Sequence, residues 1–114
     1  MKIENTKIQM RKGILEYCIL LILEQKEAYA SEIIKSLKDS KMIVVEGTVY
    51  PLLTRLKNAH FLEYKWEESK SGPPRKYYTL TADGTEFITE LKTTWTNLKY
   101  AVESLNKKSK TRES

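Results

Sequence analysis

The sequence is poor in residues that build covalent or metal-bound frameworks. Its 114 residues include one cysteine, one histidine, four glycines and three prolines. Cys18 alone cannot form a disulfide within the chain, and Cys18 with His60 cannot supply the usual ligand set of a zinc site. We therefore expect no internal disulfide, no metal and no cofactor.

Signatures of catalysis and of membrane insertion are also missing. The sequence has no paired acid and base, no glycine-rich phosphate loop and no nucleophile motif, so we do not expect an enzyme. Basic residues from Lys2 to Lys12 precede an apolar run, as in a secretory signal, but Glu16 interrupts that run. No stretch reaches the roughly 20 apolar residues of a membrane span. We expect a cytoplasmic protein with no membrane partner.

What the sequence does contain is an excess of positive charge. There are 20 lysines and arginines against 15 aspartates and glutamates, a net charge of +5. A polyanion is a natural partner for such a chain. The length corresponds to about one domain with a modest core.

Two helices are predicted in the first 40 residues. Residues 7–24 carry apolar side chains at helical spacing, on a stripe wide enough to be covered on two sides. This helix should be central to the core. A second helix should begin near Ser31, whose hydroxyl can cap it or lie in its first turn, and should end near Asp39.

A third predicted helix begins at Thr48 as the N-cap, with Pro51 in its first turn. A start at Glu46 would require a kink at the proline. The helix buries one stripe, made of Val49, Leu52, Leu53 and Leu56. His60 should follow it in a left-handed turn.

The other side of this third helix carries polar groups, including Tyr50, Thr54 and Arg55. Its hydroxyls and Arg55 could meet base edges or phosphates in a major groove. An ordinary amphipathic surface helix is the alternative for this segment taken alone.

Beyond Ala59 the apolar period changes to two. Residues 62–67 alternate apolar and charged side chains, residues 68–74 are rich in glycine, proline and serine, and residues 75–81 are β-formers. These segments predict a two-stranded hairpin that leans on the helices. Arg75 and Lys76 place adjacent cations on its return strand, where Tyr77 should point outward.

The predicted fold class is therefore mainly α (α+β), with a winged helix-turn-helix over residues 1–80. In this arrangement the third helix enters the major groove of double-stranded DNA, the second crosses the backbone, and the hairpin tip touches phosphates or the minor groove. A winged helix that binds proteins, without sequence-specific DNA binding, is the alternative.

The remaining segment predicts a dimer. Thr81 can cap a long dimerisation helix over residues 81–106. A narrow seam runs along it at alternating spacings of three and four: Ile88, Leu91, Trp95, Leu98, Val102 and Leu105. Its partner could be the same helix, or the first helix, of a second subunit. A two-fold axis would set two recognition helices about 34 Å apart, so we expect a pseudo-palindromic operator. Residues 107–114 should form a basic, disordered tail.

Three runs carry a family resemblance: YASEI, TVYPLLTRL and GPPRKYYTLT. They resemble the PadR family of bacterial transcription regulators, in particular the small members with a single C-terminal helix. The resemblance implies a homodimeric repressor, and some relatives respond to aromatic compounds. By position it implies DNA contacts from Thr48, Tyr50, Pro51, Arg55, Arg75, Lys76 and Tyr77. A second-helix phosphate contact falls on Ser31, where many members have tyrosine.

Trp95 has two interpretations. Its indole in a subunit seam could flank a slot for a flat aromatic effector. It could equally be a large interface anchor and no more.

Overall fold

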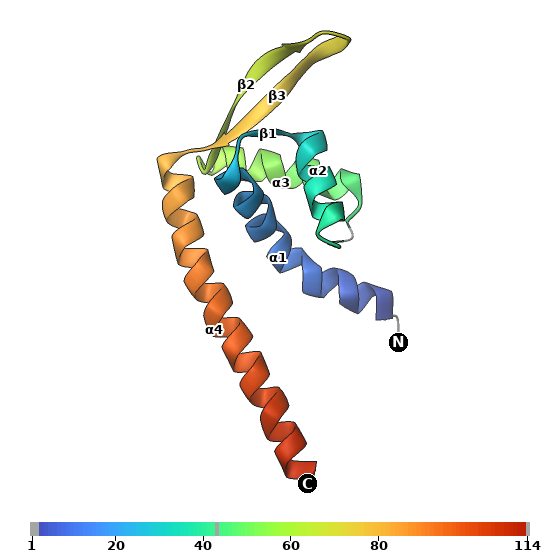
Figure 1. The fold of residues 1–114 in the computed structure, drawn as a ribbon, viewed down its shortest axis with the longest axis vertical. Coiled ribbons are helices and arrows are strands. Elements are labelled where there is room, and N and C mark those ends of the chain that lie inside the picture. Colours follow the sequence, from blue (N-terminus) through green and yellow to red (C-terminus); the bar gives the residue numbers. More distant parts are fainter. Residues whose placement is uncertain (1–2, 43, 114) are drawn as a thin grey trace.

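The computed structural model describes residues 3–42 and 44–113, with side chains to residue 107. Three helices form a cluster, a long β-hairpin rises from one end of it, and a fourth helix leaves in the opposite direction (Figure 1). The elements are α1 (Ile3–Gln25), β1 (Ala28–Tyr29), α2 (Ala30–Asp39), α3 (Glu46–Asn58), β2 (Leu62–Ser69), β3 (Gly72–Leu80) and α4 (Ala82–Glu113). The predicted fold class, mainly α with a winged helix-turn-helix, is confirmed.

The core lies where α1 meets α2, β3 and the start of α4. Ile19 and Leu20 of α1 are fully buried, and so are Ile33 of α2 and Leu53 of α3. The wide apolar stripe of α1 is covered from more than one side, as predicted, because a helix with apolar residues around most of its surface must be enclosed to leave water. α1 is thus the element against which the others are positioned.

The helix α3 begins earlier than predicted. Val45 is its N-cap residue, with no side-chain cap, and the Thr48 N–H donates to the Val45 carbonyl at 2.9 Å, so Thr48 is not the cap. Pro51 consequently lies beyond the first turn. The proline removes one donor, which would have paired with the carbonyl of Gly47. Gly47 is exposed, so solvent can satisfy that carbonyl and the helix tolerates the loss.

The end of α3 confirms the left-handed turn predicted at His60, whose φ is 67°. The Phe61 N–H donates to the Leu56 carbonyl and the His60 N–H to the Lys57 carbonyl, both at 3.0 Å. This pair of bonds is a Schellman motif, which closes the helix and reverses the chain. It directs the backbone from α3 straight into the hairpin.

The sheet has three strands, in the order β1-β3-β2, where the sequence predicts two. β1 pairs with β3 through Ala28 opposite Tyr78 and Tyr29 opposite Tyr77. The hairpin is also longer than predicted, because strand pairing continues to Ser69 opposite Gly72. Residues 73 and 74, both proline, fall at an irregularity in this register, where a missing N–H costs no ladder bond.

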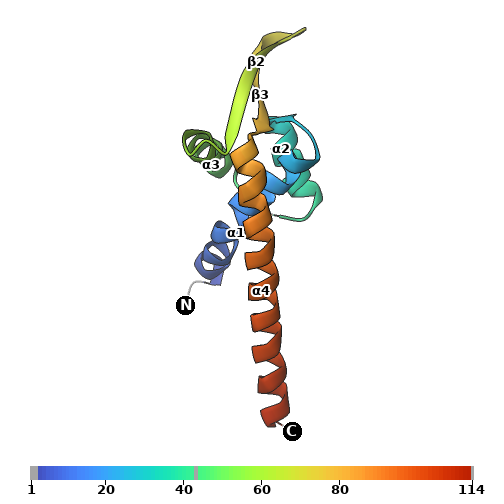
Figure 2. The same ribbon diagram turned by 90° about the vertical axis from the view of Figure 1, so that its left-hand side faces the viewer.

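α4 is capped as predicted. The Gly84 N–H donates to Thr81 Oγ1 at 2.9 Å, and that hydroxyl donates to the His60 carbonyl at 2.7 Å. The first turns of α4 pack on the core, and Lys92 forms an ion pair of 3.0 Å with Glu24 of α1. Further along, the helix projects alone from the helical cluster (Figure 2).

The backbone of α4 is helical to Glu113, whereas the sequence predicts a disordered tail from residue 107. The tail is rich in lysine and arginine, which are good helix formers, and extending an existing helix costs far less than nucleating one. Ser114 lies outside the described residues. Within the described residues, no helix combines the length and the apolar composition that crossing a membrane would take.

Candidate nucleic-acid interface

A groove of about 460 Å³, which we call the wing groove, separates the recognition helix α3 from the hairpin. It gathers side chains from α2, α3 and both hairpin strands. Its lining is Tyr29, Ala30, Ser31, Tyr50, Thr54, Trp66, Pro74, Arg75, Lys76 and Tyr78. Five residues predicted to contact DNA, which are distant in sequence, therefore share one surface: Ser31, Tyr50, Thr54, Arg75 and Lys76.

The recognition helix presents its two sides as the sequence predicts. Val49, Leu53 and Leu56 are buried, and Leu52 is half-buried. Thr48, Pro51 and Thr54 are exposed, and 51% of Tyr50 is accessible. The hydroxyls of Thr54 and Tyr50 are thus available to a ligand approaching this face.

Arg55 is placed differently from Thr54. Its guanidinium forms an ion pair with the Glu16 carboxylate of α1, and it is not part of the wing groove. The Arg55 side chain is still 69% exposed, against 21% for Glu16. Of the predicted contact residues of α3, Tyr50 and Thr54 line the wing groove, whereas Thr48, Pro51 and Arg55 do not.

The two adjacent cations of the wing lie on opposite faces of the hairpin. Lys76 is paired in register with Trp66, and its Nζ lies 5.6 Å from the indole centroid and 4.6 Å from the Tyr64 ring centroid. Arg75 lies on the other face, with Cζ 4.2 Å from the centroid of Tyr29. Both cations are therefore held against aromatic rings, which limits the conformations that they sample.

Tyr77 shares a face with Arg75, as predicted, but it does not point freely outward. Its ring meets Tyr29 edge to face, with centroids 4.8 Å apart, and the residue is half-buried. The reason is the third strand, which the sequence does not reveal and which sets Tyr29 beside Tyr77. Tyr77 thus has a packing role in addition to its predicted contact with DNA.

Tyr29 and Trp66 also line this surface, although the sequence does not identify either as a contact residue. The Tyr29 hydroxyl donates to Glu67 Oε2 at 2.8 Å, and the Tyr29 backbone N–H donates to Glu32 Oε1 at 2.9 Å, at the start of α2. The hydrogen bond to Glu67, with burial and the charge of Glu67, raises the pKa of Tyr29 above its usual value. The YASEI run contains Tyr29, but nothing local in that run indicates a partner 38 residues away.

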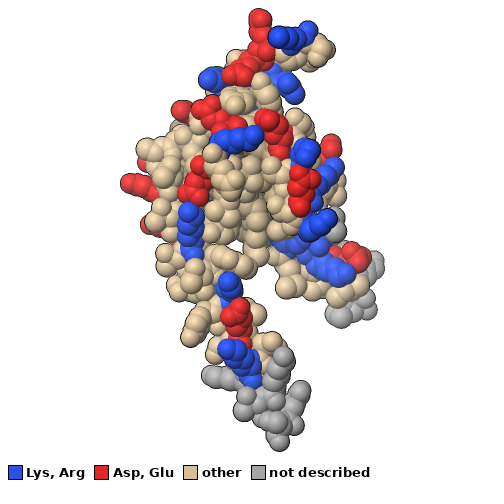
Figure 3. Space-filling view, in the orientation of Figure 1, with Lys and Arg blue, Asp and Glu red and all other residues tan. Residues whose placement is uncertain are grey.

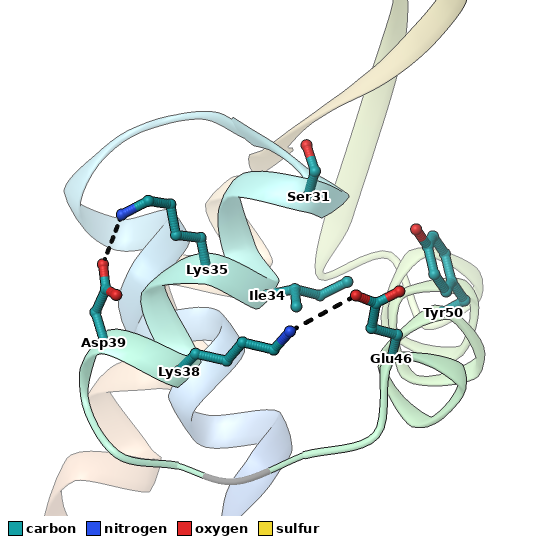
Figure 4. Close-up of a pocket in the computed structure, with 7 residues that line it drawn as sticks. All are labelled: Ser31, Ile34, Lys35, Lys38, Asp39, Glu46 and Tyr50. Carbon is teal, nitrogen blue, oxygen red and sulfur yellow. Dashed lines mark hydrogen bonds and ion pairs between the residues drawn. The ribbon is translucent and has the colours of Figure 1, made fainter.

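A second groove, of about 290 Å³, lies between α2 and α3 (Figure 4). Its two lysines already have acidic partners. Lys35 Nζ lies 2.9 Å from Asp39, which raises the pKa of Lys35, and Lys38 Nζ lies 3.7 Å from Glu46. The carboxylates of Asp39 and Glu46 would repel a phosphate here. The wing groove, in contrast, has no acidic side chain in its lining.

Charge on the face shown in Figure 3 is mixed, with acidic and basic side chains interspersed over the helices and the hairpin. Such a surface offers no continuous positive field on this side. Binding of a polyanion on this side would therefore depend on individually placed cations.

The predicted dimer seam divides in the structure. Ile88, which is predicted to lie in the subunit seam, is fully buried in the core of its own chain, because the first turns of α4 still cover the core. Leu91 is half-buried against that core. Trp95 is 40% exposed, and Leu98, Val102 and Leu105 are more exposed still. Neither groove described above includes Trp95.

Comparisons with known proteins agree with this geometry. Residues 19–90 match the family described as "Transcriptional regulator PadR-like family". A PadR-like transcription factor from Bacteroides fragilis is 57% identical, with a TM-score of 0.75, and the match covers 89% of this chain and 98% of that one.

Two further solved structures extend the comparison. A PadR-like regulator from Bacillus cereus is 41% identical, with a TM-score of 0.74, over 85% of this chain and 95% of that one. A PadR family regulator from Clostridium difficile is 31% identical, with a TM-score of 0.75, over 82% and 98%. These relatives are transcriptional regulators and not enzymes, in agreement with the prediction. The chain belongs to the PadR-like family of transcriptional regulators.

Proposed function

We propose that the protein is a cytoplasmic, homodimeric repressor that binds a pseudo-palindromic operator in double-stranded DNA. The observation that carries this proposal is the composition of the wing groove. The hydroxyl residues Ser31, Tyr50 and Thr54 line the same groove as the cations Arg75 and Lys76, and no carboxylate lines it. Hydroxyls and cations are the groups that bind phosphate oxygens, and α3 can reach base edges from the same surface.

Dimerisation is supported by apolar surface that the chain leaves uncovered. Trp95, Leu98, Val102 and Leu105 form an exposed stripe on α4. At the other end of the chain, Ile3, Ile8 and Met10 of α1 are also more than half exposed. Contiguous apolar surface of this kind marks an interaction site, and α4 or α1 of a second copy would cover it.

A small aromatic effector is a further part of the proposal. Trp95 is the least exposed residue of the apolar stripe on α4, between Leu91 on the core side and Leu98 on the open side. In a dimer its indole would lie at the seam, where a flat ligand could stack on it. Ligand binding there would change the angle between the subunits and hence the spacing of the recognition helices.

The test is selection of bound duplexes from a random DNA pool, followed by affinity measurements at several salt concentrations. We expect a two-fold symmetric motif and an affinity that falls with salt, by about 0.9 log units per log unit of salt for each phosphate neutralised. Arg75→Ala and Lys76→Ala should each flatten that slope. Thr54→Ala should change sequence preference, whereas the control Thr89→Ala on α4 should not.

Two outcomes would contradict the proposal. A monomer in sedimentation at working concentrations would exclude the dimeric arrangement. Absence of any enriched motif would favour the alternative, a winged helix that binds proteins. Affinity for DNA without sequence discrimination would support that alternative as well.

A further inference from the structure

Trp66 of β2 is a large apolar side chain with no role in the core. It is 61% exposed, although the neighbouring inward-facing residues Tyr64 and Leu62 are half-buried and buried. Its indole lines the wing groove opposite Tyr50 and Thr54 of the recognition helix. The exposed indole therefore leaves an aromatic face that a ligand of the wing groove can contact.

Trp66 also organises the cation beside it. Trp66 and Lys76 are direct cross-strand neighbours, and the rings of Tyr64 and Trp66 meet at 88° with centroids 6.0 Å apart. The ammonium of Lys76 lies within reach of both rings. An ammonium held against ring faces on one side keeps its remaining N–H donors for an acceptor on the other.

The kinds of group in the groove match the parts of a sugar-phosphate strand. Trp66 and Tyr50 supply aromatic surface, Lys76 and Arg75 supply positive charge, and Thr54 supplies a hydroxyl. A deoxyribose has an apolar face, and the phosphates on either side of it carry the charge. When a recognition helix lies in the major groove and a wing reaches past it, one DNA strand must pass between the two elements.

We propose that Trp66 is a DNA-contact residue, whose indole packs on a deoxyribose of the strand in the wing groove while Lys76 binds an adjacent phosphate. This inference rests on the proposed function, because it places a DNA strand on the same surface. It assigns to Trp66 two effects: an apolar contact with the sugar, and the positioning of Lys76. Neither effect depends on base identity, so both should act on operator and on random duplex alike.

The variants Trp66→Ala, Trp66→Phe and Lys76→Ala test this assignment. Trp66→Ala should weaken binding of the selected operator about tenfold, and Trp66→Phe should recover most of that loss. The double variant Trp66→Ala/Lys76→Ala should be weakened less than the product of the two single effects, because the side chains act as a unit. Lys65→Ala is the matched control: it removes a cation of the hairpin from the opposite face, on the neighbouring strand β2, and its effect should be smaller than that of Lys76→Ala.

A spectroscopic readout covers the case in which Trp66→Ala disturbs the wing. The chain has two tryptophans, so fluorotryptophan labelling gives two fluorine resonances, and Trp66→Phe assigns them. Addition of duplex should shift the Trp66 resonance strongly and the Trp95 resonance little.

The outcomes separate this inference from the proposed function. If the wild-type protein binds no duplex, the proposed function fails. If it binds the operator, but Trp66→Ala binds equally well and the Trp66 resonance does not move, only the assignment of Trp66 is overturned.

Discussion

The hydroxyl of Tyr29 donates a hydrogen bond of 2.8 Å to Glu67 and thereby joins the start of α2 to the wing. Arg75 lies over the same ring, and Tyr77 meets its edge. One tyrosine therefore connects the helix-turn-helix to both strands of the hairpin. This connection contributes to the angle between the wing and α3, together with the packing of β2 on α3 and of β3 on the other helices.

Removing the hydroxyl should loosen the wing without unfolding the protein. Tyr29→Phe keeps the ring under Arg75 but loses the bond to Glu67. We expect faster amide exchange at residues 75–78 and a DNA affinity reduced about fivefold, the effect of one net hydrogen bond. Tyr100→Phe, at an exposed site on α4, is the control and should change neither. Unchanged exchange in Tyr29→Phe would show that the packing of the rings alone holds the wing.

Alkaline pH should destabilise the fold. The pKa of Tyr29 is raised, first by its bond to Glu67, and burial raises the pKa of Tyr78. A phenol whose pKa is higher in the folded state stabilises the fold fully below its unfolded pKa of about 10. That contribution is lost as the pH rises through the folded values.

Denaturant unfolding from about pH 9 to 12 measures this loss. Tyr29→Phe should lose less stability over that range than the wild type does, and Tyr100→Phe should lose the same amount. A larger loss in Tyr29→Phe would contradict the raised pKa.

Gly84 allows the start of α4 to approach the backbone of Phe61 closely. A Cβ at this buried position would collide with the carbonyl of Phe61, which already accepts the Thr81 N–H at 3.1 Å. Because backbone must move, Gly84→Ala should cost about 1–3 kcal/mol of unfolding free energy. Gly13→Ala in α1 meets nothing within 4 Å and should instead stabilise by about 0.5–1 kcal/mol. Equal effects in thermal unfolding would contradict this account.

Truncation of a side chain to alanine should have different effects on stability and association at the two ends of the predicted seam. Ile88 is fully buried, so Ile88→Ala should cost about 2–5 kcal/mol of protomer stability. Leu105 is 65% exposed, so Leu105→Ala should leave protomer stability within about 0.5 kcal/mol and weaken association instead. Urea unfolding and sedimentation at several protein concentrations distinguish the two effects. Dissociation of the Ile88→Ala variant without loss of protomer stability would instead indicate that Ile88 contributes to the subunit interface.

Much of the fold follows from local patterns in the chain. The broad apolar stripe of α1, the amphipathic α3 and the cap at Thr81 depend on residues within a few turns of one another. The left-handed conformation of His60 is also local, because it closes α3 through hydrogen bonds to carbonyls of the preceding turn. For such features, periodicity and backbone sterics are sufficient.

Contacts between segments that are distant in the sequence determine the rest of the surface. The strand β1 has only two residues and exists because β3 lies beside it, so no periodicity could reveal it. The pairing of Arg55 with Glu16, the burial of Ile88 and the contact of Tyr29 with Glu67 each join separate elements. Local sequence patterns determine which side chains a helix or strand presents. The partners of those side chains depend on how the helices and strands pack together.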